Sequence, residues 1–240
     1  MNRILFEPSE IVGGCVTLSD ARAAHILKVL HGEVGQVLKT GEIDGPIGTS
    51  VITEISGSAV TVRCEHTRAS LRPWVDLILA PPRPRILKRL LPQLAALGVG
   101  RIVLVGAKRV EKDFWGATLL KRENYSPLFV DGLMQSGASI LPTLEVRRDF
   151  RRFVADELET LFAGEARFVA HPYASAGNPS FAPPQRLVLA IGPEGGWLDD
   201  EVARLEEHGF LRYSLGGRIL RTDTATIALL AQLMPKEELP

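Results

Sequence analysis

The stretch Leu187–Trp197 reads Leu-Val-Leu-Ala-Ile-Gly-Pro-Glu-Gly-Gly-Trp, and the later stretch Leu215–Ala225 reads Leu-Gly-Gly-Arg-Ile-Leu-Arg-Thr-Asp-Thr-Ala. In each, we predict that an apolar strand leads into a glycine-rich turn and then into a helix. A continuous apolar strand is typical of a parallel sheet that is covered on both faces. Ligands of open α/β sheets bind beyond the carboxyl ends of such strands. The two turns are therefore predicted to form two walls of one cofactor site.

The first turn, Gly192–Gly196, lacks the chemistry of a phosphate loop. Its glycines permit positive φ angles and let a ligand approach the backbone, but Glu194 places an acidic group there. Neither Gly-x-Gly-x-x-Gly nor Gly-Lys-Ser/Thr occurs in it. The glycines taken alone are equally compatible with a plain turn between a strand and a helix.

Composition excludes several classes of protein. The 240 residues fit one large domain or a small domain with a medium one, and 28 basic residues balance 28 acidic ones. A dedicated nucleic-acid binder is usually basic, so RNA would have to meet a local patch. Two cysteines are too few for a disulfide framework or a zinc site, and we expect no metal. With no long apolar run and no signal-peptide pattern, a cytoplasmic protein without a membrane span is expected.

The chain is expected to change architecture near residue 70. Residues 1–70 contain short β-branched segments and one helix, roughly 20–30 with a cap at Ser19 or Asp20, which favours a small β-barrel. After a linker at 67–73, strands alternate with helices, which predicts a mainly parallel sheet covered on both faces. The expected strands are 75–80, 101–105, 144–146, 167–170, 186–191 and 211–215. The expected helices are 85–97, 116–135 with a break near Pro127, 150–162, 199–208 and 222–234, and 178–185 is expected to be a surface loop.

The two motifs resemble the C-terminal signature of the RsmE family, SPOUT-class methyltransferases that methylate uridine N3 in small-subunit ribosomal RNA. Ile191–Gly196 matches the family turn in full, and Leu215–Ala225 matches the second motif except that Asp223 replaces the usual Glu. Other positions along the chain also match the family: Arg3, Ala24-His25, Val29-Leu30, Leu97-Gly98-Val99, Arg109, Gln135-Ser136-Gly137 and His171-Pro172.

The resemblance implies a PUA-like RNA-binding β-barrel at 1–70 and a trefoil-knotted SPOUT α/β methyltransferase domain at 74–240. It also implies S-adenosylmethionine as cofactor, a homodimer formed through the knot domain, and 16S ribosomal RNA or the small subunit as partner. Some polar family positions are absent: Gln93 and Ala96 replace Lys and Glu, and His31 and Ala138 replace arginines. These departures keep open the alternative of a SPOUT methyltransferase for another RNA site. A further alternative is a non-catalytic RNA-binding or ribosome-assembly protein with the same fold, against which the intact Gly192–Gly196 and Arg218–Ala225 argue.

Candidate catalytic residues follow from the chemistry of a uridine nitrogen. N3 attacks well only after losing its proton, so the enzyme must remove that proton or stabilise the anion. The fixed donors of an arginine can bind the uracil oxygens, and Arg221 lies where a helix dipole also favours negative charge. Asp223 or Glu194 could accept the proton. The alternatives are an arginine that orders its loop and an Asp223 that complements the helix dipole.

The remaining candidates fall into two sets. The cofactor set, taken from both turns and the His-Pro position, is Ile191, Gly192, Pro193, Glu194, Gly195, Gly196, Leu215, Gly216, Arg218, Ile219, Leu220, Thr222, Ala225 and His171. A lone histidine such as His171 is otherwise often structural. The RNA-binding set is Arg3, Arg22, Lys28, Arg83, Arg85, Lys88, Arg89 and Arg109. The alternative interpretation of this set is a basic face that contacts only solvent.

Overall fold

The computed structural model describes residues 2–173 and 186–235, so the loop predicted at 178–185 lies outside the described residues. The chain forms two compact units. Unit 1 comprises Met1–Arg72 with Phe129–Leu141, and unit 2 comprises Pro73–Leu128 with Pro142–Pro240.

Unit 1 is built on a five-stranded mixed sheet. Its strands are β1 (Ile4–Phe6), β2 (Cys15–Leu18), β3 (Val37–Glu42), β4 (Ile47–Ser56) and β5 (Ala59–Arg68), in the order β1-β3-β4-β5-β2. Strand β1 is parallel to β3, and the other pairs are antiparallel. Strand β2 is short, and its Val16 and Leu18 alternate inward into the core.

One α-helix and a 3-10 turn accompany this sheet. The turn η1 spans Pro8–Glu10, and α1 spans Ala21–Lys28. Asp20 caps α1, as predicted, because its carboxylate accepts the backbone N–H of Arg22 at 2.9 Å. The helix is shorter than expected, since Val29 and Leu30 are exposed rather than packed and His31 has a positive φ of 50°.

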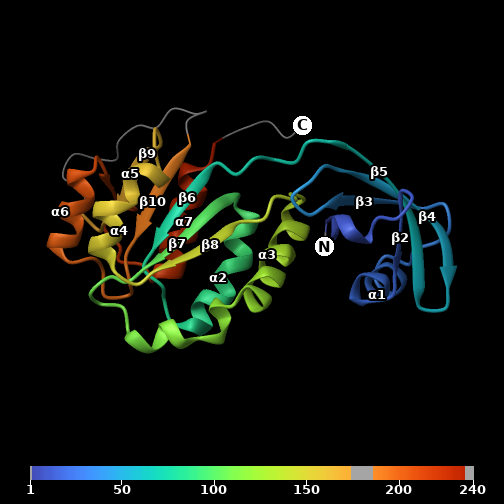
Figure 1. Cartoon of the computed structure of the whole chain (residues 1–240), viewed down its shortest axis with the longest axis horizontal. Helices are drawn as coiled ribbons and strands as arrows, with labels where there is room; N and C mark the ends of the chain where they lie inside the picture. Colours follow the sequence, from blue (N-terminus) through green and yellow to red (C-terminus); the bar gives the residue numbers. More distant parts are fainter. Residues whose placement is uncertain (1, 174–185, 236–240) are drawn as a thin grey trace. The chain divides into compact units, whose positions relative to one another are not determined.

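Unit 2 contains a six-stranded, wholly parallel sheet, which confirms the predicted α/β architecture (Figure 1). Its order is β11-β9-β10-β6-β7-β8, and β10 pairs with β6 in register from Leu187↔Val75 to Ile191↔Leu79. The central strands β6 and β10 are buried along their whole length. The strands are β6 (Val75–Leu79), β7 (Val99–Val105), β8 (Thr143–Arg147), β9 (Ala166–Ala170), β10 (Leu187–Ile191) and β11 (Leu211–Tyr213).

Helices cover both faces of this sheet. On one face, α4 (Phe150–Asp156), α5 (Leu158–Leu161) and α6 (Asp199–Glu207) pack their apolar side chains on the inward residues of β6, β7, β9 and β10. Helices α2 (Pro84–Ala96) and α7 (Thr222–Leu233) pack against each other on the opposite side of the sheet (Figure 1). Gly98 follows α2 with φ +80°, the conformation in which a glycine commonly ends a helix.

Two predicted helices differ from the structure. The region 116–135 begins as the 3-10 turns η2 (Lys112–Gly116) and η3 (Thr118–Leu120), and α3 (Arg122–Ser136) then passes through Pro127 without a break. Pro127 lies near the start of α3, where it removes one hydrogen bond to the first turn, so the helix continues. The predicted helix 150–162 is instead split into α4 and α5 at Glu157, whose φ of −121° is not helical.

The strand order creates a switch point in unit 2. The chain passes from β6 outward to β7 and β8, and then returns to build β9, β10 and β11 on the other side of β6. In such sheets the loops beyond the carboxyl ends of the strands diverge and leave a crevice for ligands. The loops after β9, β10 and β11 are therefore placed together at one edge. Among the described residues, no helix is both long and apolar enough to cross a bilayer.

Candidate functional site

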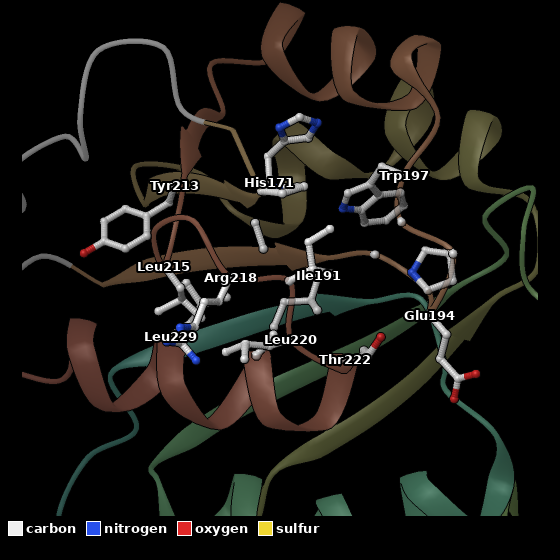
Figure 2. Close-up of a pocket in the computed structure, with 18 of the residues that line it drawn as sticks. His171, Ile191, Glu194, Trp197, Tyr213, Leu215, Arg218, Leu220, Thr222 and Leu229 are labelled. Carbon is white, nitrogen blue, oxygen red and sulfur yellow. The ribbon is translucent and has the colours of Figure 1, made fainter.

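A cavity of about 330 Å³ lies at the carboxyl edge of the sheet in unit 2 (Figure 2). The loops after β7, β9, β10 and β11 and one side of α7 form its wall. The wall is mostly apolar, with a few polar groups, as is usual for sites that bind small molecules. Its residues are Arg109, Ala170, His171, Pro172, Ile191–Trp197, Tyr213, Leu215, Gly216, Arg218, Ile219, Leu220, Thr222, Ala225 and Leu229.

Every residue of the predicted cofactor set lies on this wall. The lining residues outside that set are Arg109, which was predicted to bind RNA, and Ala170, Pro172, Trp197, Tyr213 and Leu229. Ala170 and Tyr213 end strands β9 and β11, and Leu229 follows Thr222 and Ala225 at helical spacing on α7. The positions of these residues at strand ends and at helical spacing can be seen in the sequence, once the two strands and the helix are assigned.

The first glycine-rich turn, Gly192–Gly196, is closely packed beneath the cavity. A Cβ atom on Gly192 would lie 3.0 Å from the Trp197 ring, so a side chain there would displace the indole. Trp197 is buried and packs on Phe150 with ring centroids 5.3 Å apart. Gly196 has a φ of +74°, and its N–H donates to the Pro193 carbonyl at 2.8 Å. The glycines are thus required by backbone conformation and by close packing.

Glu201, on the first turn of α6, joins Leu198, two residues after this turn, to the loop after β7. Its side chain is 5% exposed, and it accepts the backbone N–H of Leu198 at 2.9 Å and that of Lys108 at 2.8 Å. Helix α6 begins at Asp199, and Leu198 precedes it as the N-cap residue, so Glu201 bonds back to the N-cap N–H. This buried carboxylate was not identified from the sequence.

The three catalytic candidates are placed differently. Glu194 lies on the cavity wall, about half exposed, and its carboxylate is 3.8 Å from the Arg83 guanidinium. Arg221 is the exposed N-cap residue of α7, between wall residues Leu220 and Thr222 but not itself part of the wall. Asp223 is in the first turn of α7, and its carboxylate is 3.4 Å from Arg89.

His171 reaches the wall from the end of β9. Its backbone N–H donates to the Tyr213 carbonyl at 3.0 Å, which joins the loops after β9 and β11. Its ring Nδ1 accepts the backbone N–H of Tyr173 at 3.2 Å. The histidine therefore orders two loops of the cavity as well as lining it.

Two of the predicted RNA-binding residues use their donors inside unit 1. The Arg3 guanidinium donates to the carbonyls of Thr40, Gly48 and Gly137 at 2.7–3.0 Å, and burial, followed by the charge of Arg68, lowers its pKa. Arg22 donates to the Leu5 carbonyl at 2.9 Å.

Arg22 also forms ion pairs with Glu10 and Asp20, and its hydrogen bonds to these carboxylates, Glu10 first, raise its pKa. These contacts stabilise unit 1 and leave the two arginines little freedom to bind phosphate.

The other predicted RNA-binding residues are all exposed. Lys28 is exposed at the end of α1 in unit 1. Arg83, Arg85, Lys88 and Arg89 are exposed in unit 2, at the N-cap and in the first two turns of α2. Arg109 lies on the cavity wall, where its guanidinium donates to the Gly195 carbonyl. No cluster of three or more potential metal ligands occurs in residues 2–173 or 186–235.

Comparison with known proteins identifies relatives along the whole chain. A model of the RNA methyltransferase domain matches residues 70–234. The ribosomal RNA small subunit methyltransferase E of Treponema pallidum is 32% identical over 98% of this chain and 91% of its own length. The protein of the same name from Synechocystis is 26% identical over 96% of this chain and 76% of its own length.

Solved structures resemble the chain over both units. A Legionella pneumophila putative methyltransferase in complex with the bound cofactor SAM is 28% identical, with a TM-score of 0.72 over 97% of this chain and 96% of that one. The fold is also that of a Neisseria gonorrhoeae ribosomal RNA small subunit methyltransferase E bound to S-adenosyl methionine. That structure is 23% identical, with a TM-score of 0.76 and the same coverage.

Proposed function

Since the chain belongs to the RsmE family of ribosomal RNA small subunit methyltransferases, we propose that it methylates uridine N3 of 16S ribosomal RNA with S-adenosylmethionine. The observation that carries the proposal is the convergence of both glycine-rich turns on one cavity, at the edge where open α/β sheets bind ligands. A relative of 28% identity carries SAM on the same fold, which supports the choice of cofactor.

The cavity fits this cofactor in size and chemistry. Its volume of about 330 Å³ falls in the range of small-molecule sites. Ile191, Leu220 and Leu229 offer apolar surface for an aromatic base, and Gly196 and Gly216 leave the backbone accessible to polar atoms. When bound, S-adenosylmethionine supplies an electrophilic methyl group. The chain then has to align the target nitrogen with that group.

Arg221 is our candidate for stabilising the uridine anion. It lies at the N-terminus of α7 beside the cavity, where the helix dipole favours negative charge. A guanidinium placed there can donate two hydrogen bonds to a uracil carbonyl oxygen as charge develops on it.

The proton from N3 needs an ionised acceptor, and Glu194 and Asp223 are the candidates. Each carboxylate lies within ion-pair distance of an arginine of the α2 region, at 3.8 Å for Arg83 and 3.4 Å for Arg89.

The exposed cations of the α2 region would bind the phosphates of the substrate. Arg83, Arg85, Lys88 and Arg89 lie together in the sequence and on the surface of unit 2. Phosphate contacts position an RNA without reading its sequence, and they make binding dependent on salt. The target base has to leave its stack before N3 can be reached.

The finer architecture of the family belongs to the same proposal. Unit 1 would act as a PUA-like RNA-binding barrel, the segment from β10 to α7 would form a trefoil knot, and two chains would associate through the methyltransferase domain. The five-stranded sheet of unit 1 and the parallel sheet of unit 2 are compatible with these features. A cytoplasmic location would follow from a ribosomal RNA substrate.

Calorimetry with S-adenosylmethionine, followed by mass mapping of 16S ribosomal RNA from a deletion strain, tests the proposal. Binding together with the loss of one 3-methyluridine supports it. Binding with no missing mark on that RNA would favour a different RNA site, the alternative suggested by Gln93, Ala96, His31 and Ala138. Absence of binding at millimolar cofactor would contradict both and favour a non-catalytic role.

A variant tests the assignment of Arg221. Arg221→Ala is expected to lower turnover by about 100-fold, the usual effect of removing a donor to a developing anion. The dissociation constant for the cofactor should stay within about two-fold, because Arg221 is not part of the cavity wall. Equal losses of turnover and of cofactor affinity would show that the residue orders the turn instead.

A further inference from the structure

We propose that Arg109 is a positioning residue that fixes the Gly192–Gly196 turn in the conformation that receives the cofactor. This inference rests on the proposed function, and it assigns to Arg109 a role different from the RNA contact expected from the sequence. The inference depends on the contacts of Arg109, Gly195 and Glu201.

Arg109 contacts the turn through both a hydrogen bond and close packing. Its Nη1 donates to the Gly195 carbonyl, and a Cβ atom on Gly195 would lie 3.0 Å from the Arg109 Cδ. The aliphatic part of the arginine therefore covers the face of Gly195 that a side chain would otherwise occupy. A charged donor also makes a stronger hydrogen bond to a carbonyl than a neutral one.

The peptide between Gly195 and Gly196 is held at both of its polar atoms. Arg109 engages the Gly195 carbonyl, and the Gly196 N–H donates to the Pro193 carbonyl at 2.8 Å. Gly196 has a φ of +74°, and two successive glycines have a large conformational freedom in the absence of such contacts. Without the guanidinium, we expect this peptide to sample other orientations.

The loop that carries Arg109 is itself firmly held, so it can act as a support. The Gly106 N–H donates to the Arg147 carbonyl at 2.8 Å, and Ala107 is buried in the core. Glu201 then accepts the N–H of Lys108 and that of Leu198, at either end of the same carboxylate. Arg109 thus connects the loop after β7 to the glycine-rich turn, and Glu201 connects the same loop to Leu198, two residues after the turn.

These contacts distinguish a positioning role from RNA binding. A phosphate contact would contribute to the salt dependence of RNA affinity and leave cofactor affinity unchanged. A positioning contact would contribute to cofactor affinity and leave the salt dependence of RNA binding unchanged, because the turn forms part of the cavity wall.

Two variants of Arg109 test the inference by calorimetry with S-adenosylmethionine and no RNA. Arg109→Met should raise the dissociation constant about tenfold, a typical effect of losing one charge-assisted hydrogen bond. Arg109→Lys should raise it less, since an ammonium still offers a donor. The control is Arg85→Met, an exposed cation of α2 away from the wall, which should weaken RNA binding and reduce its salt slope while leaving the cofactor constant unchanged.

Amide hydrogen exchange without any ligand provides a readout independent of cofactor binding. Faster exchange at Gly196 and Leu198 in Arg109→Met, with unchanged exchange in β6 and β10, is the expected result. If the unsubstituted protein binds no cofactor while this exchange still changes, the proposed function fails and the positioning contact stands. Unchanged exchange and cofactor affinity in Arg109→Met, with a reduced salt slope for RNA, would overturn the inference.

Discussion

Replacing Glu165 by glutamine is expected to stabilise unit 2 above neutral pH and to have little effect near pH 4. Glu165 precedes β9 at the amino edge of the parallel sheet, and its side chain is 13% exposed. Its Oε2 is buried and has no hydrogen-bond partner among the described residues. Burial, followed by repulsion from Asp76, raises the pKa of Glu165 to about 7 from an ordinary value of 4.5.

The direction in which stability changes with pH depends on the pKa of Glu165 in the folded and unfolded states. Between pH 4.5 and 7 the unfolded chain ionises Glu165 while the folded protein keeps its proton, so stability falls as the pH rises through this window and levels off above it. The pKa shift of Glu165 corresponds to a loss of about 3 kcal/mol in the free energy of unfolding above pH 7. Solvent screening of a group near the surface reduces this loss to about 2 kcal/mol. Arg186, whose Nε is 3.6 Å from the Glu165 carboxylate, also offsets part of the cost.

Urea unfolding monitored by tryptophan fluorescence measures this effect in the relevant unit. The chain has three tryptophans, Trp74, Trp115 and Trp197, and all lie in unit 2. The difference in unfolding free energy between Glu165→Gln and the unsubstituted protein should grow by about 2 kcal/mol from pH 5 to pH 8. Parallel stability curves over that range would refute the reasoning, because they would mean that Glu165 ionises normally.

The other predictions concern packing and single hydrogen bonds. Gly106→Ala should destabilise unit 2 by about 3 kcal/mol or more in the same assay, since a Cβ there would lie 1.9 Å from the Arg148 carbonyl oxygen. Trp74→Phe should cost about 1–2 kcal/mol by circular dichroism, because its indole donates a 2.7 Å hydrogen bond. Trp197→Phe should cost about 1–3 kcal/mol through lost packing on Phe150, with no hydrogen-bond loss, because its buried N–H has no partner among the described residues. Arg22→Ala should speed amide exchange across the sheet of unit 1, since it removes charge-assisted hydrogen bonds worth about 1–3 kcal/mol.

The sequence predicted the sheet of unit 2 well because its central strands carry a pattern with few alternatives. Leu187–Ile191 is a run of five apolar residues between turn residues, and all five are buried in the structure. By contrast, the predicted helix 150–162 retains its apolar spacing across Glu157, where the backbone departs from helical geometry. Periodicity predicts which face is buried and does not reveal a local change in backbone angle.

The site could be predicted as a set of residues but not as a set of contacts. The two glycine-rich turns identified much of the cavity wall, because the ends of parallel strands converge on one edge of the sheet. Charge alone could not distinguish Arg3, which donates to three carbonyls inside unit 1, from Arg85, which is exposed. Whether an arginine binds a partner or the protein's own backbone depends on tertiary contacts that the sequence pattern does not specify.

The ion pairs beside the cavity would limit how strongly the proposed RNA-binding cations attract a phosphate. The exposed Arg83 and Arg89 each lie within 4 Å of a carboxylate, the half-exposed Glu194 or the less exposed Asp223, and a pair near the surface contributes about 0–1 kcal/mol. An RNA phosphate can replace the carboxylate beside either arginine, because the existing ion pair is weak. Breaking that ion pair nevertheless offsets part of the free energy gained from the new contact with the phosphate. The salt slope of RNA binding should therefore be shallower than the number of cations in the α2 region suggests. Because the two carboxylates released in this way are the candidate proton acceptors, the binding of phosphate and the freeing of a base would be coupled through the same two arginines.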